Sequence, residues 1–229
     1  MVRRKWVVIA AAVLLVAGLG VLFYPQAREN IYERQVAAIQ RDFYQNLLRL
    51  QGEIDPLHEY LKEKNEKLFA NGQEGLVNAL SYEQPAVDLS AYGLRDNCIG
   101  FVSLPSIDML LPIYLGANEE NMRKGAVHMT QTSYPIGGEN TNSVIAAHRG
   151  SAVLKFRYID RIAVGDEIII TNFREELVYR AVEVKIIAPT DVSAILIQQG
   201  RDLITLVSCH PLGFQHQRYI VIAERVNIA

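Results

Sequence analysis

Hydrophobic positions follow different patterns along the chain, and the pattern near the amino terminus is the simplest. Residues 6–24 form an apolar run without a charged side chain. About 19 residues, each rising about 1.5 Å in a helix, are enough to cross a hydrocarbon core of roughly 30 Å. The run is therefore predicted to be a transmembrane helix.

Three basic residues, Arg3, Arg4 and Lys5, precede this run. Because basic residues favour the cytoplasmic side, they are expected to place everything after Tyr24 outside the cell. A cleaved signal peptide is the alternative. The run exceeds an ordinary signal core, and Tyr24-Pro25-Gln26 offers no small-residue cleavage site. These features favour an uncleaved anchor that crosses the plasma membrane once.

The next pattern is amphipathic. From Tyr32 to Leu50, apolar residues recur at steps of three and four with charges between them, which predicts a helix over residues 26–52. A second helix is predicted over residues 55–70, with Asp55 as the N-cap and Pro56 in the first helical position. We interpret this hairpin as a stalk or support; a direct catalytic role is the alternative.

Residues 73–97 show no sustained periodicity, and they include Pro85, Gly93 and Asn97. A long irregular connection in a compact protein is either functional or a linker. We therefore expect a lid or a mobile connector here.

From residue 99 onward, short runs rich in Val, Ile, Tyr and Thr alternate with turn residues, which predicts a mainly β fold. Short helices fit only between these runs, at 119–124, 152–159 and 192–198. Many short strands in such a length favour a small β-barrel or sandwich. The predicted strands are 99–104, 109–114, 143–148, 167–171, 177–187, 203–209 and 219–226.

Charge and cysteine content narrow the function. The net charge is −2 and the isoelectric point is about 6.2, so no overall basic excess points to a nucleic-acid partner. The two cysteines, Cys98 and Cys209, supply neither a disulfide framework nor a C-x-x-C pair. Their spacing argues against a structural zinc site.

Cys209 lies where a strand is expected to end. Pro211 stops the ladder of the predicted strand 203–209, so a loop there can expose the thiol. If this strand pairs as a hairpin with residues 218–224, Arg218 faces Cys209 with Cβ atoms roughly 5 Å apart. A cation in that position lowers a thiol pKa and can stabilise an oxyanion formed by attack of the sulfur.

A nucleophilic thiol also needs a partner that handles protons. His210, His216 and His148 are candidates, and His148 ends its own predicted strand as Cys209 does. Each residue alone has an ordinary explanation, because lone cysteines are often small buried hydrophobes and lone histidines are often structural. A metal site built from Cys209 and these three histidines fits no common ligand spacing.

Together these segments resemble the sortase family over residues 97–229. Residues 205–209 read T-L-V-S-C, where the family has T-L-x-T-C, and residues 147–150 read A-H-R-G, where it has G-H-R-G. Arg218 occupies the position of the family's arginine at the start of the last strand. Further matches, in the family's order, are residues 107–114, 125–128 and 132–138.

The resemblance implies an eight-stranded sortase β-barrel over residues 98–229, preceded by an anchor at 1–25 and a helical and lid or linker region at 26–97. Sortases cleave the Thr–Gly bond of an LPXTG-like sorting signal through a thioacyl enzyme, which an amine resolves. By the same resemblance, Cys209 is the nucleophile, His148 the acid and base, and Arg218 the oxyanion stabiliser. Ser208 is expected to line the substrate site and His128 to be structural. No cofactor or metal is implied.

Class C sortases, which polymerise pilins, are the most similar subgroup. The Y-L-G-A segment at 114–117, the loop 137–142 and the C-x-P motif at 209–211 resemble that class. Its Asp-Pro-aromatic lid motif is missing from residues 81–97. The implied partners are LPXTG-like proteins, with a pilin lysine as the amine acceptor. Anchoring of surface proteins to a peptidoglycan precursor, a thiol hydrolase and a non-catalytic assembly module remain alternatives.

Overall fold

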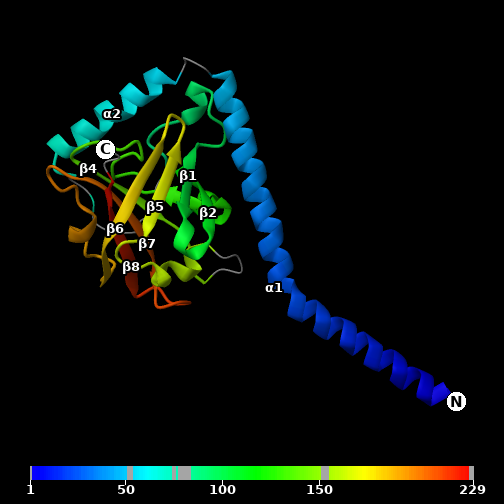
Figure 1. Ribbon diagram of the computed structural model, residues 1–229. Helices are drawn as coiled ribbons and strands as arrows, with labels where there is room; N and C mark the ends of the chain where they lie inside the picture. Colours follow the sequence, from blue (N-terminus) through cyan, green and yellow to red (C-terminus); the bar gives the residue numbers. More distant parts are fainter. Residues whose placement is uncertain (1, 51–53, 74–75, 77–83, 151–154, 227–229) are drawn as a thin grey trace.

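In the computed structural model, which describes residues 2–50, 54–73, 76, 84–150 and 155–226, eight strands close into a barrel (Figure 1). This confirms the mainly β prediction and the eight-stranded fold that the resemblance implied. The strands are β1 (Cys98–Leu104), β2 (Met109–Leu115), β3 (Ala126–His128), β4 (Thr141–Ala146), β5 (Glu167–Asn172), β6 (Glu176–Ile187), β7 (Asp202–His210) and β8 (Gln217–Arg225).

Neighbouring strands follow the order β1-β2-β3-β4-β7-β8-β6-β5, and β5 pairs with β1 to close the barrel. Two pairs, β2 with β3 and β4 with β7, are parallel, and the other pairs are antiparallel. Closure gives each of the eight described strands a neighbour on both sides, which removes a route to aggregation. Ile99, Phe101 and Ile113 are among the fully buried residues of the core.

Short helices connect the strands. The helix α3 (Glu119–Lys124) begins and ends where predicted, and the Asn118 side chain caps it by accepting a hydrogen bond from the Asn121 N–H at 2.9 Å. The other two predicted helices, 192–198 and 152–159, correspond to shorter 3₁₀ helices. These are η4 (Ser193–Ile195) and η3 (Phe156–Arg161). Residues 151–154 lie outside the described part. The remaining turns are η1 (Leu89–Tyr92) and η2 (Pro105–Ile107).

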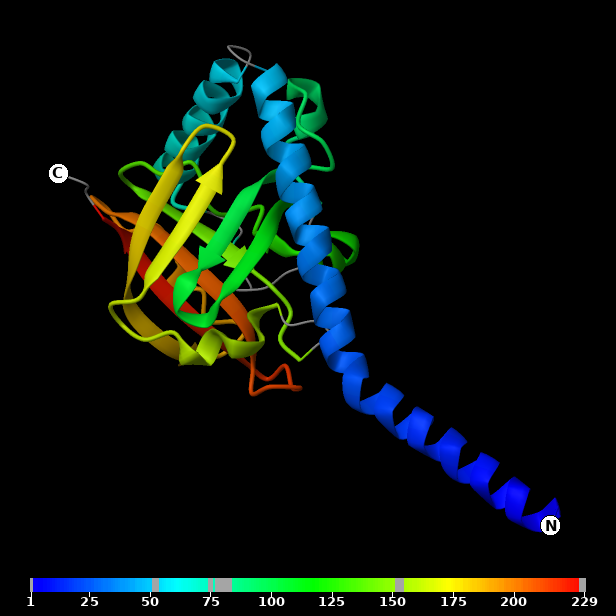
Figure 2. The ribbon, with the colours of Figure 1, turned by 45° about the vertical axis from the view of Figure 1, so that its right-hand side comes forward.

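The first two predicted helices, 6–24 and 26–52, are one continuous helix, α1 (Val2–Arg49), which contains Pro25. Both segments are helical, as predicted, and the chain stays helical through Pro25 between them. Figures 1 and 2 show the amino-terminal part of α1 pointing away from the barrel. This part includes an 18-residue window of mean hydropathy 2.7, none of it buried, so its length and composition suit a membrane span.

The second part of α1 packs along the barrel beside β1 and β2 (Figure 2). Val36 and Phe43 are buried, and the Phe43 ring meets Phe101 edge-on at 5.4 Å between centroids. The Tyr32 hydroxyl donates a hydrogen bond to the Lys124 carbonyl at 3.0 Å. These contacts fix the direction in which α1 leaves the barrel.

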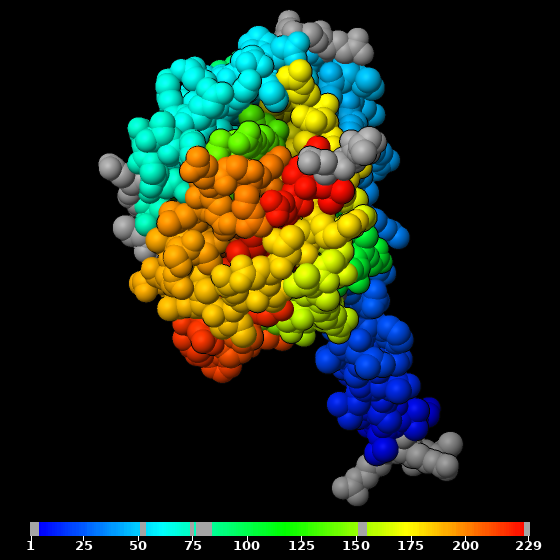
Figure 3. Space-filling model, turned by 60° about the vertical axis from the view of Figure 1, so that its left-hand side comes forward, coloured from blue at the N-terminus to red at the C-terminus, as the bar shows by residue number. Residues whose placement is uncertain are grey.

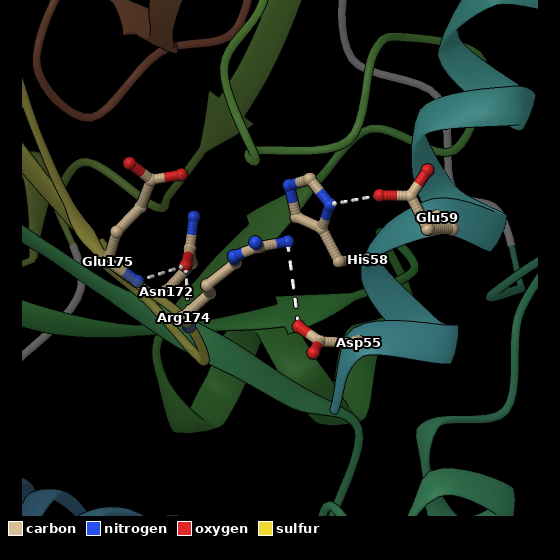
Figure 4. Close-up of polar contacts among 6 residues, drawn as sticks. All are labelled: Asp55, His58, Glu59, Asn172, Arg174 and Glu175. Carbon is tan, nitrogen blue, oxygen red and sulfur yellow. Dashed lines mark hydrogen bonds and ion pairs between the residues drawn. The ribbon is translucent and has the colours of Figure 1, made fainter. Parts of the chain in front are cut away.

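The helix α2 (Asp55–Ala70) covers the end of the barrel at the β5–β6 turn. An Asp55 carboxylate oxygen lies 3.7 Å from an Arg174 guanidinium nitrogen (Figure 4). The Asn172 side chain holds that turn by accepting from the N–H groups of Arg174 and Glu175. Asp55 is the first helical residue rather than the N-cap, which is Ile54.

Residues 84–97 pack on the barrel, so the expected mobile connector does not extend over them. Val87, Leu89 and Leu94 are buried, and the Asn97 side chain accepts a hydrogen bond from the Leu89 N–H at 2.8 Å. This burial could not be predicted, because residues 84–97 have no periodic pattern of apolar positions. The rest of the expected lid, residues 74–75 and 77–83, lies outside the described residues.

Candidate active site

The parallel pairing of β4 with β7 brings the ends of these two strands together. Ala146 pairs with Val207, so the residues that follow β4 emerge beside the end of β7. His148 lies two residues beyond β4, which ends earlier than the predicted strand 143–148. His148 and Cys209 line one pocket of about 290 Å³, together with Arg149, Gly150, Gly213, Phe214 and Gln215.

Cys209 and Arg218 are opposite each other in the antiparallel pair of β7 and β8. This confirms the predicted register, which the hairpin spacing fixed. Opposed residues in such a pair have Cβ atoms about 4.5–5.5 Å apart. The Cys209 side chain is half-buried, so the thiol is both shielded and reachable from the pocket.

The Arg218 guanidinium is buried and only partly hydrogen-bonded. One terminal nitrogen donates to the carbonyls of Gln215 and Gln217, at 2.8 and 3.2 Å. The Nε atom is buried without a hydrogen-bond partner among the described residues. An unpaired buried donor costs about 1–3 kcal/mol, so this N–H favours an acceptor that arrives from outside.

Burial and neighbouring charges separate the pKa values of the two titrating groups. Burial raises the pKa of the Cys209 thiol, and the Arg218 charge opposes that effect. Burial lowers the pKa of His148, the Lys155 ammonium lowers it further, and Glu119 opposes both. Neutral thiol and neutral imidazole are therefore the main forms near neutral pH.

Lys155 also acts on the charge of His148, although no sequence pattern pointed to it. It is buried, and its ammonium donates a hydrogen bond to the Met122 carbonyl. Burial lowers the Lys155 pKa to about 8, and Arg123 adds to that shift. Lys155 is thus mostly charged at neutral pH and disfavours a second positive charge on His148.

Ser208 has a different environment from the one expected. Its side chain is buried and its hydroxyl donates to the Ala147 carbonyl at 2.7 Å. This bond ties β7 to the residue before His148. Ser208 is not among the residues that line the pocket, and its contact with substrate stays a prediction.

The histidines His128, His210 and His216 are not among the residues that line the pocket. The His216 ring lies tilted against the Phe214 ring with centroids 5.2 Å apart, and the Nδ1 atom of His210 is 3.1 Å from an Arg149 guanidinium nitrogen. His128 is fully buried, lies 2.9 Å from the Ser133 carbonyl, and has a pKa lowered by burial to about 4. Of the three partners left open for Cys209, only His148 lines its pocket.

Arg149 is a buried positioning residue that sequence reasoning missed. Its guanidinium pairs with Asp160 at 2.7 Å, donates to the Arg157 carbonyl at 3.3 Å and contacts His210. Arg149 therefore holds the loop that carries His148 against the end of β7. Its place directly after His148 in the A-H-R-G motif was the available signal.

A thiol that shares a pocket with a histidine and faces an arginine is typical of enzymes with a cysteine nucleophile. Residues 102–226 match the sortase domain, and the chain belongs to the sortase family. Sortases are cysteine transpeptidases. The fold and the family thus agree with the resemblance found in the motifs.

Relatives extend this similarity. Sortase D of Bacillus subtilis is 30% identical over 131 residues, which cover 56% of this chain and 64% of that protein. Sortase C1 of the GBS pilus island 1 has a similar structure, with a TM-score of 0.75, 28% identity and coverage of 84% and 93% of the two chains. Streptococcus pneumoniae sortase C gives a TM-score of 0.64, 27% identity and coverage of 82% and 96%.

The curated relatives are matched over only part of their length. The chain covers less than two thirds of B. subtilis sortase D, at 64%, and of Listeria monocytogenes sortase A, at 57%.

Proposed function

We propose that this protein is a membrane-anchored transpeptidase that cleaves an LPXTG-like sorting signal and transfers the acyl group to an amine. The observation that carries the proposal is the shared pocket of Cys209 and His148, with Arg218 directly opposite the thiol. In this proposal, residues 98–229 form the catalytic barrel, residues 26–97 support it and residues 1–25 anchor it.

Acylation begins when the proton of the Cys209 thiol passes to His148. The thiolate attacks the threonine carbonyl carbon of the sorting signal, and the carbonyl oxygen gains negative charge. Arg218 stabilises that charge with its guanidinium group, whose Nε–H has no partner among the described residues. The His148 imidazolium then gives its proton to the departing glycine nitrogen, which leaves a thioester on Cys209.

Deacylation reverses these roles. Neutral His148 accepts a proton from the incoming amine, whose nitrogen attacks the thioester carbonyl. Collapse of the second tetrahedral intermediate forms an amide and releases the Cys209 thiolate, which recovers its proton from His148. Water in place of the amine gives hydrolysis, so exclusion of water from the pocket decides between the two outcomes.

The amino-terminal part of α1 would hold this site at the outer face of the plasma membrane. Its window of mean hydropathy 2.7 is unburied, and Arg3, Arg4 and Lys5 precede the apolar run. Basic residues on the cytoplasmic side place the barrel outside the cell.

A pilin lysine is the proposed acceptor. The support is the similarity to sortase C1 of a pilus island and to a pneumococcal sortase C whose description concerns pilin substrate specificity. The Asp-Pro-aromatic motif of the pilin-polymerising class is missing from residues 81–97, which favours a second candidate, transfer to a peptidoglycan precursor.

Competition between acceptors tests this proposal. The full-length enzyme in detergent would be incubated with an LPXTG-type peptide and either a lysine-containing pilin domain or a peptidoglycan-precursor amine. We expect an isopeptide bond to the pilin lysine, identified by tandem mass spectrometry. If the acyl group is transferred only to the peptidoglycan-precursor amine, the second candidate is favoured. If the peptide is only hydrolysed with every amine, the protein is a thiol hydrolase instead.

A further inference from the structure

The loop between β7 and β8, residues 211–216, presents apolar side chains to solvent at the catalytic end of the barrel. Leu212 is 42% exposed and Phe214 is 58% exposed. Ile186, which pairs with Tyr219 near the same end, is 49% exposed. Single exposed apolar residues are ordinary, but a group beside a functional pocket indicates a partner.

Contacts along α1 locate this end relative to the apolar segment. Tyr158 of η3 lines a pocket together with Glu29 and Tyr32 of α1. Asp160 of η3 pairs with Arg149, which also contacts His210 at the end of β7. The catalytic end is therefore level with the turn of α1 that follows Glu29.

Tyr24, where the apolar run ends, is only five residues before Glu29. Five helical residues rise roughly 8 Å. The headgroup region extends roughly 5–8 Å beyond each side of the hydrocarbon core. In Figures 1, 2 and 3, the loop between β7 and β8 lies at the end of the barrel from which the amino-terminal part of α1 emerges.

We infer that residues 211–216 contact the lipid bilayer surface, with Leu212 and Phe214 in the headgroup region. The inference rests on the membrane anchoring proposed above. Leu and Phe are suited to the boundary between headgroups and acyl chains, while Gln215 and His216 supply polar neighbours. A bilayer is favoured over a protein partner because α1 fixes this end at the membrane surface.

This placement sets a preference among substrates. Phe214 and Gly213 also line the Cys209 pocket, so the pocket opens beside lipid. A donor whose sorting signal is tethered to the same membrane reaches the thiol in two dimensions, at a high effective concentration. A free peptide in solution lacks that advantage.

Tryptophan fluorescence of the full-length protein in vesicles tests the contact. Trp6 is the only tryptophan of the chain, so Trp6→Phe removes its fluorescence. A single new tryptophan is then introduced into this variant, as Phe214→Trp in one protein and as Leu212→Trp in another. Vesicles would contain phosphatidylglycerol with either plain or brominated acyl chains. We expect brominated lipid to remove roughly half of the emission from either loop position, because the loop lies at the acyl boundary.

Phe69→Trp in the same background is the matched control. Phe69 is 37% exposed and lies beside Thr141, at the start of β4 and thus at the opposite end of the barrel. Its emission should be insensitive to brominated lipid.

The unmodified protein separates the possible failures. Quenched Trp6 together with unquenched loop positions would overturn the contact while leaving the anchor intact. Unquenched Trp6 would contradict the anchor and the contact together. Loop positions that respond to a soluble LPXTG-type peptide, but not to brominated lipid, would make residues 211–216 a peptide-binding surface instead. Thioester formation on Cys209 tests the catalytic proposal independently of all three outcomes.

Discussion

Opposite shifts of two pKa values define the protonation chemistry of Cys209 and His148. The active form in the proposed reaction is thiolate with imidazolium. With ordinary pKa values of about 8.5 and 6.5, this pair amounts to on the order of one molecule in a hundred near neutral pH. A raised thiol pKa and a lowered imidazole pKa reduce that fraction further.

The pH dependence of kcat/KM follows from these shifts. Between the two pKa values, loss of imidazolium and gain of thiolate cancel, so the profile is flat there. We expect the acid limb below about 6.5 and the alkaline limb above about 8.5. Lys155→Met should move the acid limb upward, because it removes a charge that lowers the His148 pKa. A narrow profile inside those limits, unmoved by Lys155→Met, would contradict this assignment.

Arg218→Lys tests the oxyanion role. Lysine keeps the positive charge but not the planar set of donors, which includes the Nε–H that has no partner among the described residues. Loss of one oxyanion donor costs roughly 3–4 kcal/mol, so kcat should fall by about a hundred- to a thousand-fold. Thermal unfolding monitored in parallel should be similar to that of the unmodified protein. Near-normal turnover would remove Arg218 from the site.

Among the elements, the packed segment 84–97 gives a stability prediction. Leu89 is fully buried, so Leu89→Ala should lower the free energy of unfolding by about 2–5 kcal/mol. Val164→Ala, at a site 64% exposed, is the control and should have little effect. Denaturant titration measures both. If Leu89→Ala and Val164→Ala have the same free energy of unfolding, residues 84–97 belong to the mobile connector that was first expected.

The elements also show what sequence patterns could and could not predict. Alternation and β-branched content located seven strands to within a few residues, because each has its own local pattern. β3 has only three residues, too few for a pattern, and the parallel pairing of β4 with β7 is a long-range feature. Hairpin spacing predicted that Cys209 faces Arg218. Spacing alone left His148, His210 and His216 open, and only the motif resemblance singled out His148, which the tertiary structure brings into the Cys209 pocket.

At the scale of the whole molecule, one helix joins the apolar run to the barrel. Fractionation of cells should therefore recover the full-length chain with the membrane, because residues 6–24 are uncharged and remain unburied by the barrel. Extraction should require detergent rather than high salt. A soluble form that begins near residue 26 would instead support a cleaved signal peptide.

The central claim is that Cys209 forms the acyl-enzyme. Cys98, the only other cysteine, is buried at the start of β1, where burial raises its pKa to about 12. It was expected just before the first strand, and it matches no catalytic motif. Only Cys209 lines the pocket with His148.

Mass spectrometry of the enzyme incubated with an LPXTG-type peptide, without an amine, tests this claim most directly. We predict a thioester that maps to Cys209, persists in Cys98→Ala and is absent from Cys209→Ala. His148→Ala should prevent turnover while the barrel stays folded. An adduct on Cys98, or activity that survives in Cys209→Ala, would contradict the proposed mechanism.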